Sequence, residues 1–303
     1  ADFHSFISMQ SKKHQCAIVC ASTSSLDDFE GKPKNIQVLR LHVHTPPNND
    51  YLDGQNLRAQ SFYRWMQNNP KLLPSTQPPD MESIVETFEY LAKKGYTDII
   101  VPTISSTLSR TYADVSDIAR LMRKQVTVHV VDTGTVGIME GLFSLKANQM
   151  LNEHYTPLEI VRRLTVMARQ MHIFFVLDST QYLVKNGRIS TMKGALSTIF
   201  NIKPILHFHN GSLKQAGKIA KIENAIEHLM KLAKETQEGR RAQIIGMYSG
   251  DSALYKRLED QLQRSYGVKV PAYPITPVVG AHIGPRAIGL GLWLHDHSDI
   301  KGL

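Results

Sequence analysis

The chain has 303 residues, of which 42% are hydrophobic and 20% charged, and its formal net charge at pH 7 is +8. This length is enough for two domains with separate cores, and the composition is that of a soluble globular protein. No run approaches the roughly 18 apolar residues of a membrane span, and no apolar signal-peptide core is visible, so we predict a cytoplasmic protein. The basic residues form scattered pairs, such as Arg162–Arg163 and Arg240–Arg241, without the aromatic-lined basic stripe of a nucleic-acid-binding surface.

The first half of the chain alternates short apolar runs with helical patterns. Cys16 and Cys20 bracket the first run, and two cysteines provide neither a disulfide framework nor a zinc quartet. The expected strands cover 17–20, 37–43, 98–101 and 127–131, and the expected helices cover 61–67, 81–94, 113–124 and 137–152. This alternation predicts an α/β domain with a mainly parallel sheet, which we assign to residues 1–155.

A second domain is expected over residues 156–303. It begins with a helix from Pro157 to about Gln170, and its other expected helices cover 221–236 and 252–266. The expected strands are 173–177, 203–208 and 244–248, followed by a C-terminal apolar run over 277–294. The tetrapeptide His209-Asn210-Gly211-Ser212 indicates a hairpin turn, so we predict a mixed or antiparallel sheet in this α/β domain.

Five hydroxyl groups crowd one expected turn between a strand and a helix. They belong to Ser105, Ser106, Thr107, Ser109 and Thr111. The free N–H groups and the positive dipole end of a helix favour an anion, and hydroxyls add donors. The turn lacks the glycine and lysine of a phosphate loop, which favours a smaller anion such as a carboxylate. The alternative is that Ser109 or Thr107 merely caps the helix.

A second hydroxyl pair, Ser75 and Thr76, precedes another expected helix. Pro78 and Pro79 have no N–H groups for Thr76 to cap, so these hydroxyls remain available for a ligand. Ligands of parallel α/β sheets bind outside the carboxyl ends of the strands. The two hydroxyl turns therefore indicate one shared anion site.

Seven motifs in one order make the chain resemble the DegV family of bacterial fatty-acid-binding proteins, from about Ala17 to Leu294. The motifs are Ser-Thr-Gln-Pro at 75–78, Ile-Ser-Ser-Thr-Leu-Ser-Arg-Thr-Tyr at 104–112, Val-Asp-Thr at 131–133, Tyr-Leu-Val-Lys-Asn-Gly-Arg-Ile-Ser at 182–190, Ile-Lys-Pro-Ile-Leu at 202–206, His-Asn-Gly at 209–211 and Gly-Ala-His-Ile-Gly-Pro at 280–285.

The resemblance implies a lipid carrier rather than an enzyme. It implies two α/β domains with a long-chain fatty acid buried between them, whose carboxylate is held by hydroxyls and a histidine. The motifs place these roles on Ser75, Ser109 and His282, and Thr76 and Arg188 are further candidate contacts. No catalytic residue, metal or cofactor is implied, only the fatty acid as ligand.

Some members of the family carry the lipid for a two-component fatty acid kinase, so the resemblance also implies a possible ATP-binding partner protein. Three positions depart from the family pattern. Ala21 and Ala220 stand where the family usually has aspartate and arginine, and Arg110 replaces a glycine next to Ser109.

Two other functions remain alternatives. Ser109 and His282 are suited as the nucleophile and base of a serine-dependent acyl hydrolase, although the Gly-x-Ser-x-Gly motif is missing. The pairs His42-x-His44 and His295-x-His297 would place two imidazoles on one face of a strand, but neither pair has an evident third metal ligand nearby.

Overall fold

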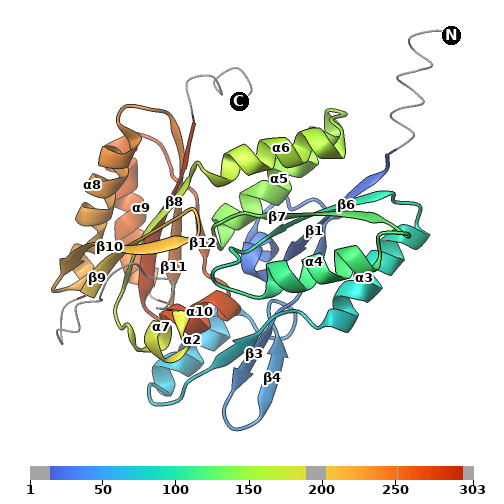
Figure 1. Cartoon of the computed structure of the whole chain (residues 1–303). Helices are drawn as coiled ribbons and strands as arrows, with labels where there is room; N and C mark the ends of the chain where they lie inside the picture. Colours follow the sequence, from blue (N-terminus) through green and yellow to red (C-terminus); the bar gives the residue numbers. More distant parts are fainter. Residues whose placement is uncertain (1–13, 189–202, 251, 296–303) are drawn as a thin grey trace.

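The computed structural model describes residues 14–188, 203–250 and 252–295. Two large sheets lie side by side, and a small third sheet extends from the first (Figure 1). In this part of the chain, no helix is long and apolar enough to cross a membrane.

The first large sheet is wholly parallel, as predicted, with the strand order β2-β1-β6-β7. Its strands are β1 (Cys16–Ala21), β2 (Gln37–Leu39), β6 (Asp98–Thr103) and β7 (Thr127–Asp132). Alternate β1 side chains face opposite layers: Val19 packs with α3 (Met81–Lys93) and α4 (Thr111–Leu121), whereas Ile18 packs with α5 (Ile138–Asn152) and α6 (Pro157–Ala168). Burial on both faces explains the nearly continuous apolar runs of β1 and β6.

The small sheet consists of β3 (His42–Thr45), β4 (Asn49–Leu52) and β5 (Ser75–Gln77). The single strand expected over 37–43 is therefore divided between β2 and β3, which belong to different sheets. Helix α2 (Ala59–Asn68) connects β4 to β5.

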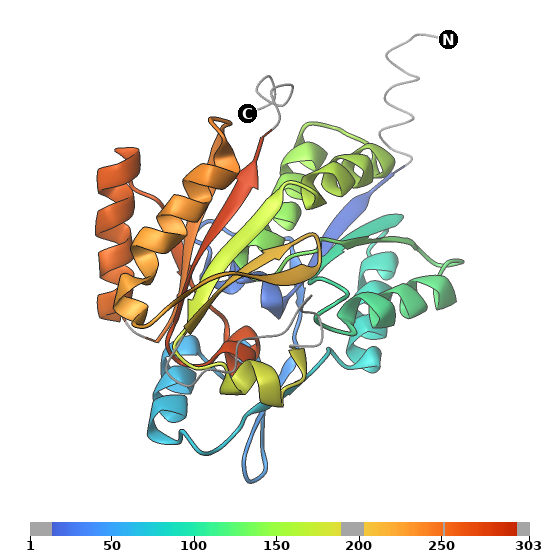
Figure 2. The same cartoon turned by 60° about the vertical axis from the view of Figure 1, so that its left-hand side comes forward.

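The second large sheet has the order β10-β9-β8-β13-β11-β12, and all its pairs are antiparallel except β11 with β12. This confirms the predicted mixed sheet. The strands are β8 (Met171–Leu177), β9 (Lys203–His209), β10 (Ser212–Ile219), β11 (Ala242–Ser249), β12 (Ala272–Pro274) and β13 (Ala287–Leu294). Helices α8 (Ala225–Gln237) and α9 (Ser252–Tyr266) cover its outer face (Figure 2). The predicted hairpin turn joins β9 to β10, with positive φ at Asn210 and Gly211.

The C-terminal apolar run over 277–294 is not one element. It forms the helix α10 (Pro277–Ile283) and then β13. Pro277 occupies the first turn of α10, where its missing N–H costs nothing, and Gly284 ends the helix with a φ of 92°. This helix is too short to show a helical period in the sequence. It carries His282.

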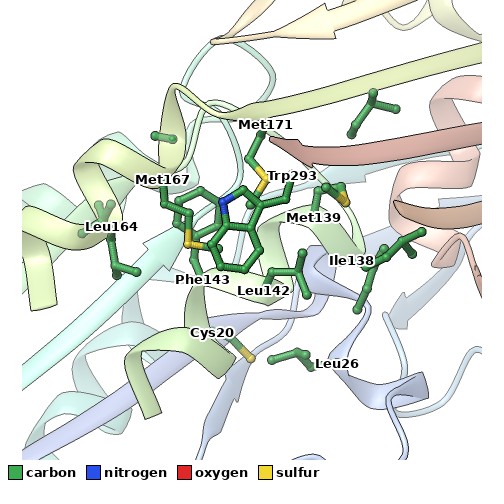
Figure 3. Close-up of a cluster of buried hydrophobic side chains, with 14 of the residues drawn as sticks. Cys20, Leu26, Ile138, Met139, Leu142, Phe143, Leu164, Met167, Met171 and Trp293 are labelled. Atoms are coloured by element: carbon green, nitrogen blue, oxygen red, sulfur yellow. The ribbon is translucent and has the colours of Figure 1, made fainter. Parts of the chain in front are cut away.

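The main core joins the two halves of the molecule. Side chains from α5, α6, β8 and β13 point toward one another in Figure 3, among them Phe143, Met167, Met171 and Trp293. Helix α6, which we assigned to the second half, packs on β6 and β7 of the first sheet. The division into domains 1–155 and 156–303 remains a prediction.

Candidate ligand-binding site

A cavity of about 340 Å³ lies between the first and second large sheets. Its floor comes from segments that follow the carboxyl ends of the parallel strands, as expected for an α/β sheet. Its wall is mostly apolar and includes Leu41, Ile104, Leu108, Val136, Ile173, Phe175, Leu183, Phe208, Leu213, Met247, Val278, Val279, Ile283 and Ile288. The shape and lining suit a long apolar ligand.

A threonine and a histidine meet at the cavity. Thr76 lies in β5 and His282 in the last turn of α10, and Thr76 Oγ1 is 2.7 Å from His282 Nε2. His282 Nδ1 is buried, with no hydrogen-bond partner in the described part of the chain. Burial, together with the nearby positive charge of Arg188, lowers the pKa of His282 to about 3, so the imidazole is neutral near pH 7. His282 therefore lines the cavity as a neutral imidazole whose Nε2 is paired with Thr76.

Ser109 also lines the cavity. Its Oγ lies 2.8 Å from Thr111 Oγ1 and accepts a hydrogen bond from the Thr111 backbone N–H at 3.2 Å. The capping role and the anion-binding role expected for this turn are therefore compatible. Ser109 accepts a hydrogen bond at the start of α4 and also lines the cavity.

The other hydroxyls of the 104–112 motif have structural partners. Ser106 donates to the Asp132 carboxylate, and Ser105 pairs with Thr107 at 2.8 Å. Ser105 and Thr107 lie against the β9–β10 hairpin: a Cβ on Gly211 would lie 3.3 Å from Ser105 Oγ. Of the serine and threonine residues in this motif, Ser109 is the one that lines the cavity.

Ser75 does not reach the cavity. It is exposed in β5, whereas Thr76 is half-buried and lines the cavity beside His282. Neighbouring residues of a strand point to opposite faces, so the register of β5 selects Thr76. The structure thus places Thr76, and not Ser75, at the cavity, and we propose Thr76 for the role that the motif assigned to Ser75.

Arg188 lines the cavity and also supports its wall. Its Nε donates to the Leu108 carbonyl at 3.1 Å, and its Nη1 donates to the Asn186 carbonyl at 2.8 Å. These bonds tie the segment after α7 (Gln181–Lys185) to the loop that carries Ser109. Arg110, the other cation at the cavity, is exposed and lies 3.8 Å from Asp114.

Sequence reasoning did not select Thr23, Ser25 or Glu140. Thr23 and Ser25 line the cavity just after β1. Like Ser109, they are hydroxyl residues at the carboxyl end of a parallel strand, and this pattern could have selected them. Glu140 lies in the first turn of α5 and has no sequence signal of burial, yet it is 1% exposed.

Glu140 provides a pH-dependent prediction. Burial raises its pKa well above the ordinary value, so its folded-state pKa exceeds its unfolded one. Its stabilising contribution is complete below an unfolded pKa of about 4.3 and is lost as pH rises. Relative to wild type, Glu140→Gln should therefore gain stability between pH 5 and 8, by at most about 1.4 kcal/mol per pH unit.

Urea unfolding across this pH range measures the trend, and Glu86→Gln on the exposed side of α3 is the control. A constant difference between Glu140→Gln and wild type would contradict it.

The alternative functions find little geometric support. His282 pairs with Thr76, and Ser109 pairs with Thr111, rather than with each other. His42 and His44 lie 3.1 and 3.2 Å from Asp50, and no described group of three ligating residues is suited to a metal ion. His297 lies outside the described residues.

Comparison with known proteins now confirms the resemblance seen in the sequence. The fold is α/β, with two sheets that share one cavity. The chain belongs to the DegV family: the family model described as "Uncharacterised protein, DegV family" matches residues 15–294. A DegV domain-containing protein of Staphylococcus aureus (strain COL) is 31% identical over 280 residues, which cover 91% of this chain and 96% of the relative.

Two solved structures share the fold. DegV from Bacillus subtilis, described as a fatty acid binding protein, has a TM-score of 0.82 at 23% identity and covers 93% of this chain and 100% of its own. A stearic acid-binding protein from Eubacterium ventriosum has a TM-score of 0.83 at 20% identity, with coverage of 94% and 100%. These likenesses establish the architecture.

Proposed function

We propose that this protein binds a long-chain fatty acid in the cavity between its two large sheets and carries it. The observation behind the proposal is the partly buried Thr76–His282 pair, 2.7 Å apart, at an otherwise mostly apolar cavity. The family membership and the fatty acids named for the two solved structures support it.

The chemistry of the cavity matches both parts of a fatty acid. A sixteen-carbon acyl chain would gain about 12 kcal/mol from burial at ~0.8 kcal/mol per methylene, before the costs of binding. A buried carboxylate needs hydrogen bonds, and in this proposal they come from the hydroxyls of Thr76 and Ser109 and from the His282 ring, which all line the cavity. Arg188 adds positive charge beside His282. A carboxylate at this position would also raise the pKa of His282 and favour its second proton.

A comparison of palmitic acid with its methyl ester tests the role assigned to the carboxylate. The ester keeps the acyl chain but removes the charge, so we expect it to bind the delipidated protein at least about tenfold more weakly, as expected for lost hydrogen bonds to a charged group. Displacement of a fluorescent fatty acid measures both affinities. Equal affinities would show that the polar end of the cavity does not recognise a carboxylate.

We confine the proposal to binding and carriage. The family resemblance also implies presentation of the bound acid to a separate kinase, but Ala21 and Ala220 lack the side chains that are usual there. A purified fatty acid kinase ATP-binding protein, added with ATP and loaded carrier, would test that role by the formation of acyl phosphate.

A further inference from the structure

Thr23 is a second hydroxyl-bearing residue of the cavity wall. This residue lies in the short helix η1 (Ser22–Ser24) that follows β1, is 1% exposed, and lines the cavity. Its Oγ1 lies 2.8 Å from Oε2 of Glu140. The hydroxyl is thus held in place by a fully buried carboxyl group.

The polar groups behind Thr23 are incompletely satisfied. Glu140 Oε1 and Ser144 Oγ, one helical turn apart on α5, are buried without a hydrogen-bond partner in the described part of the chain. Burial raises the pKa of Glu140 well above its ordinary value. The Thr23 hydroxyl either donates to the Glu140 carboxyl group or, where that group is protonated, accepts from it. Thr23 therefore has a remaining proton or lone pair to offer.

Thr23 lines the same cavity as the carboxylate site but comes from a different element. The short helix η1, which carries Thr23, packs against α10, which carries His282. Thr23, Thr76 and His282 all line one cavity. A ligand whose carboxylate binds His282 and Thr76 therefore has its acyl chain in the cavity that Thr23 lines.

We propose that Thr23, supported by Glu140, hydrogen-bonds a hydroxyl group carried on the acyl chain, so that the preferred ligand class is monohydroxy fatty acids. This inference rests on the proposed fatty acid site. A hydroxyl both donates and accepts, so it can pair with Thr23 whichever way the Thr23–Glu140 bond is oriented. Fatty acids without a hydroxyl group on the acyl chain lack this partner and leave Thr23 facing apolar carbon atoms.

The test compares palmitic acid with a series of monohydroxypalmitic acids that carry the hydroxyl at different carbons. We expect at least one isomer to bind the delipidated wild-type protein more tightly than palmitic acid does. Thr23→Val should reduce the preference for that isomer over palmitic acid at least tenfold, and Thr23→Ser should retain it. Thr76→Val should weaken both ligands alike, because it acts on the shared carboxylate.

The outcomes separate this inference from the proposed function. If no isomer binds wild type more tightly than palmitic acid, or if the preference survives in Thr23→Val, the Thr23 assignment is wrong while the fatty acid site stands. If neither palmitic acid nor any isomer binds, both proposals fail. The wild-type series decides the question even if Thr23→Val does not fold.

Discussion

Replacement of Thr76 by valine should weaken the binding of a long-chain fatty acid by roughly tenfold or more. The change keeps the shape of the side chain but removes its hydroxyl. A hydrogen bond to a charged group contributes about 1.5–3 kcal/mol, and the buried His282 Nε2 would also lose its partner at 2.7 Å. Isothermal titration of the delipidated protein with palmitic acid measures the loss.

Ser75→Ala is the matched control for this variant. Ser75 precedes Thr76 in β5 but is exposed and does not line the cavity, so its removal should change the affinity less than twofold. If Ser75→Ala weakened binding as much as Thr76→Val, the carboxylate would lie on the other face of β5 and our proposal for Thr76 would be wrong.

The largest effect on stability is expected at Phe143. Its side chain is fully buried in the cluster of Figure 3, where α5 lies between the first sheet and β13. Truncation of a buried phenylalanine leaves a cavity, and we expect Phe143→Ala to lower the free energy of unfolding by about 3–5 kcal/mol. Urea denaturation followed by circular dichroism measures the change.

Leu158→Ala on α6 serves as the control for Phe143→Ala. Leu158 is 63% exposed, so its truncation should alter the unfolding free energy by no more than about 0.5 kcal/mol.

Because the Phe143 cluster includes residues of both halves, the wild-type protein should unfold in one transition. Two separate transitions, with only one of them shifted by Phe143→Ala, would show that the halves fold independently.

The sequence predicts the parallel sheet of the first half well, because β1 and β6 are buried on both faces and appear as apolar runs. It fails where elements are short. The three-residue β5 has too little pattern to define its register, and register alone decides between Ser75 and Thr76. The seven-residue α10 has no clear period of its own, so the apolar run over 277–294 did not reveal that a helix precedes β13.

The candidate site shows the same limit. Ser109 and His282 could be selected by motif, and the structure places both at the cavity. Thr23 could have been noticed as a hydroxyl after a parallel strand, but its bond to Glu140 joins residues that are 117 positions apart. Such a long-range contact depends on how α5 packs on β1, which local sequence patterns do not specify.

Native mass spectrometry of the purified protein, followed by solvent extraction and lipid analysis, tests fatty acid binding most directly. We expect one fatty acid per chain, released on extraction with its carboxylate intact, and loss of this adduct in Thr76→Val. An empty protein that also takes up no added palmitic acid would contradict the proposed function.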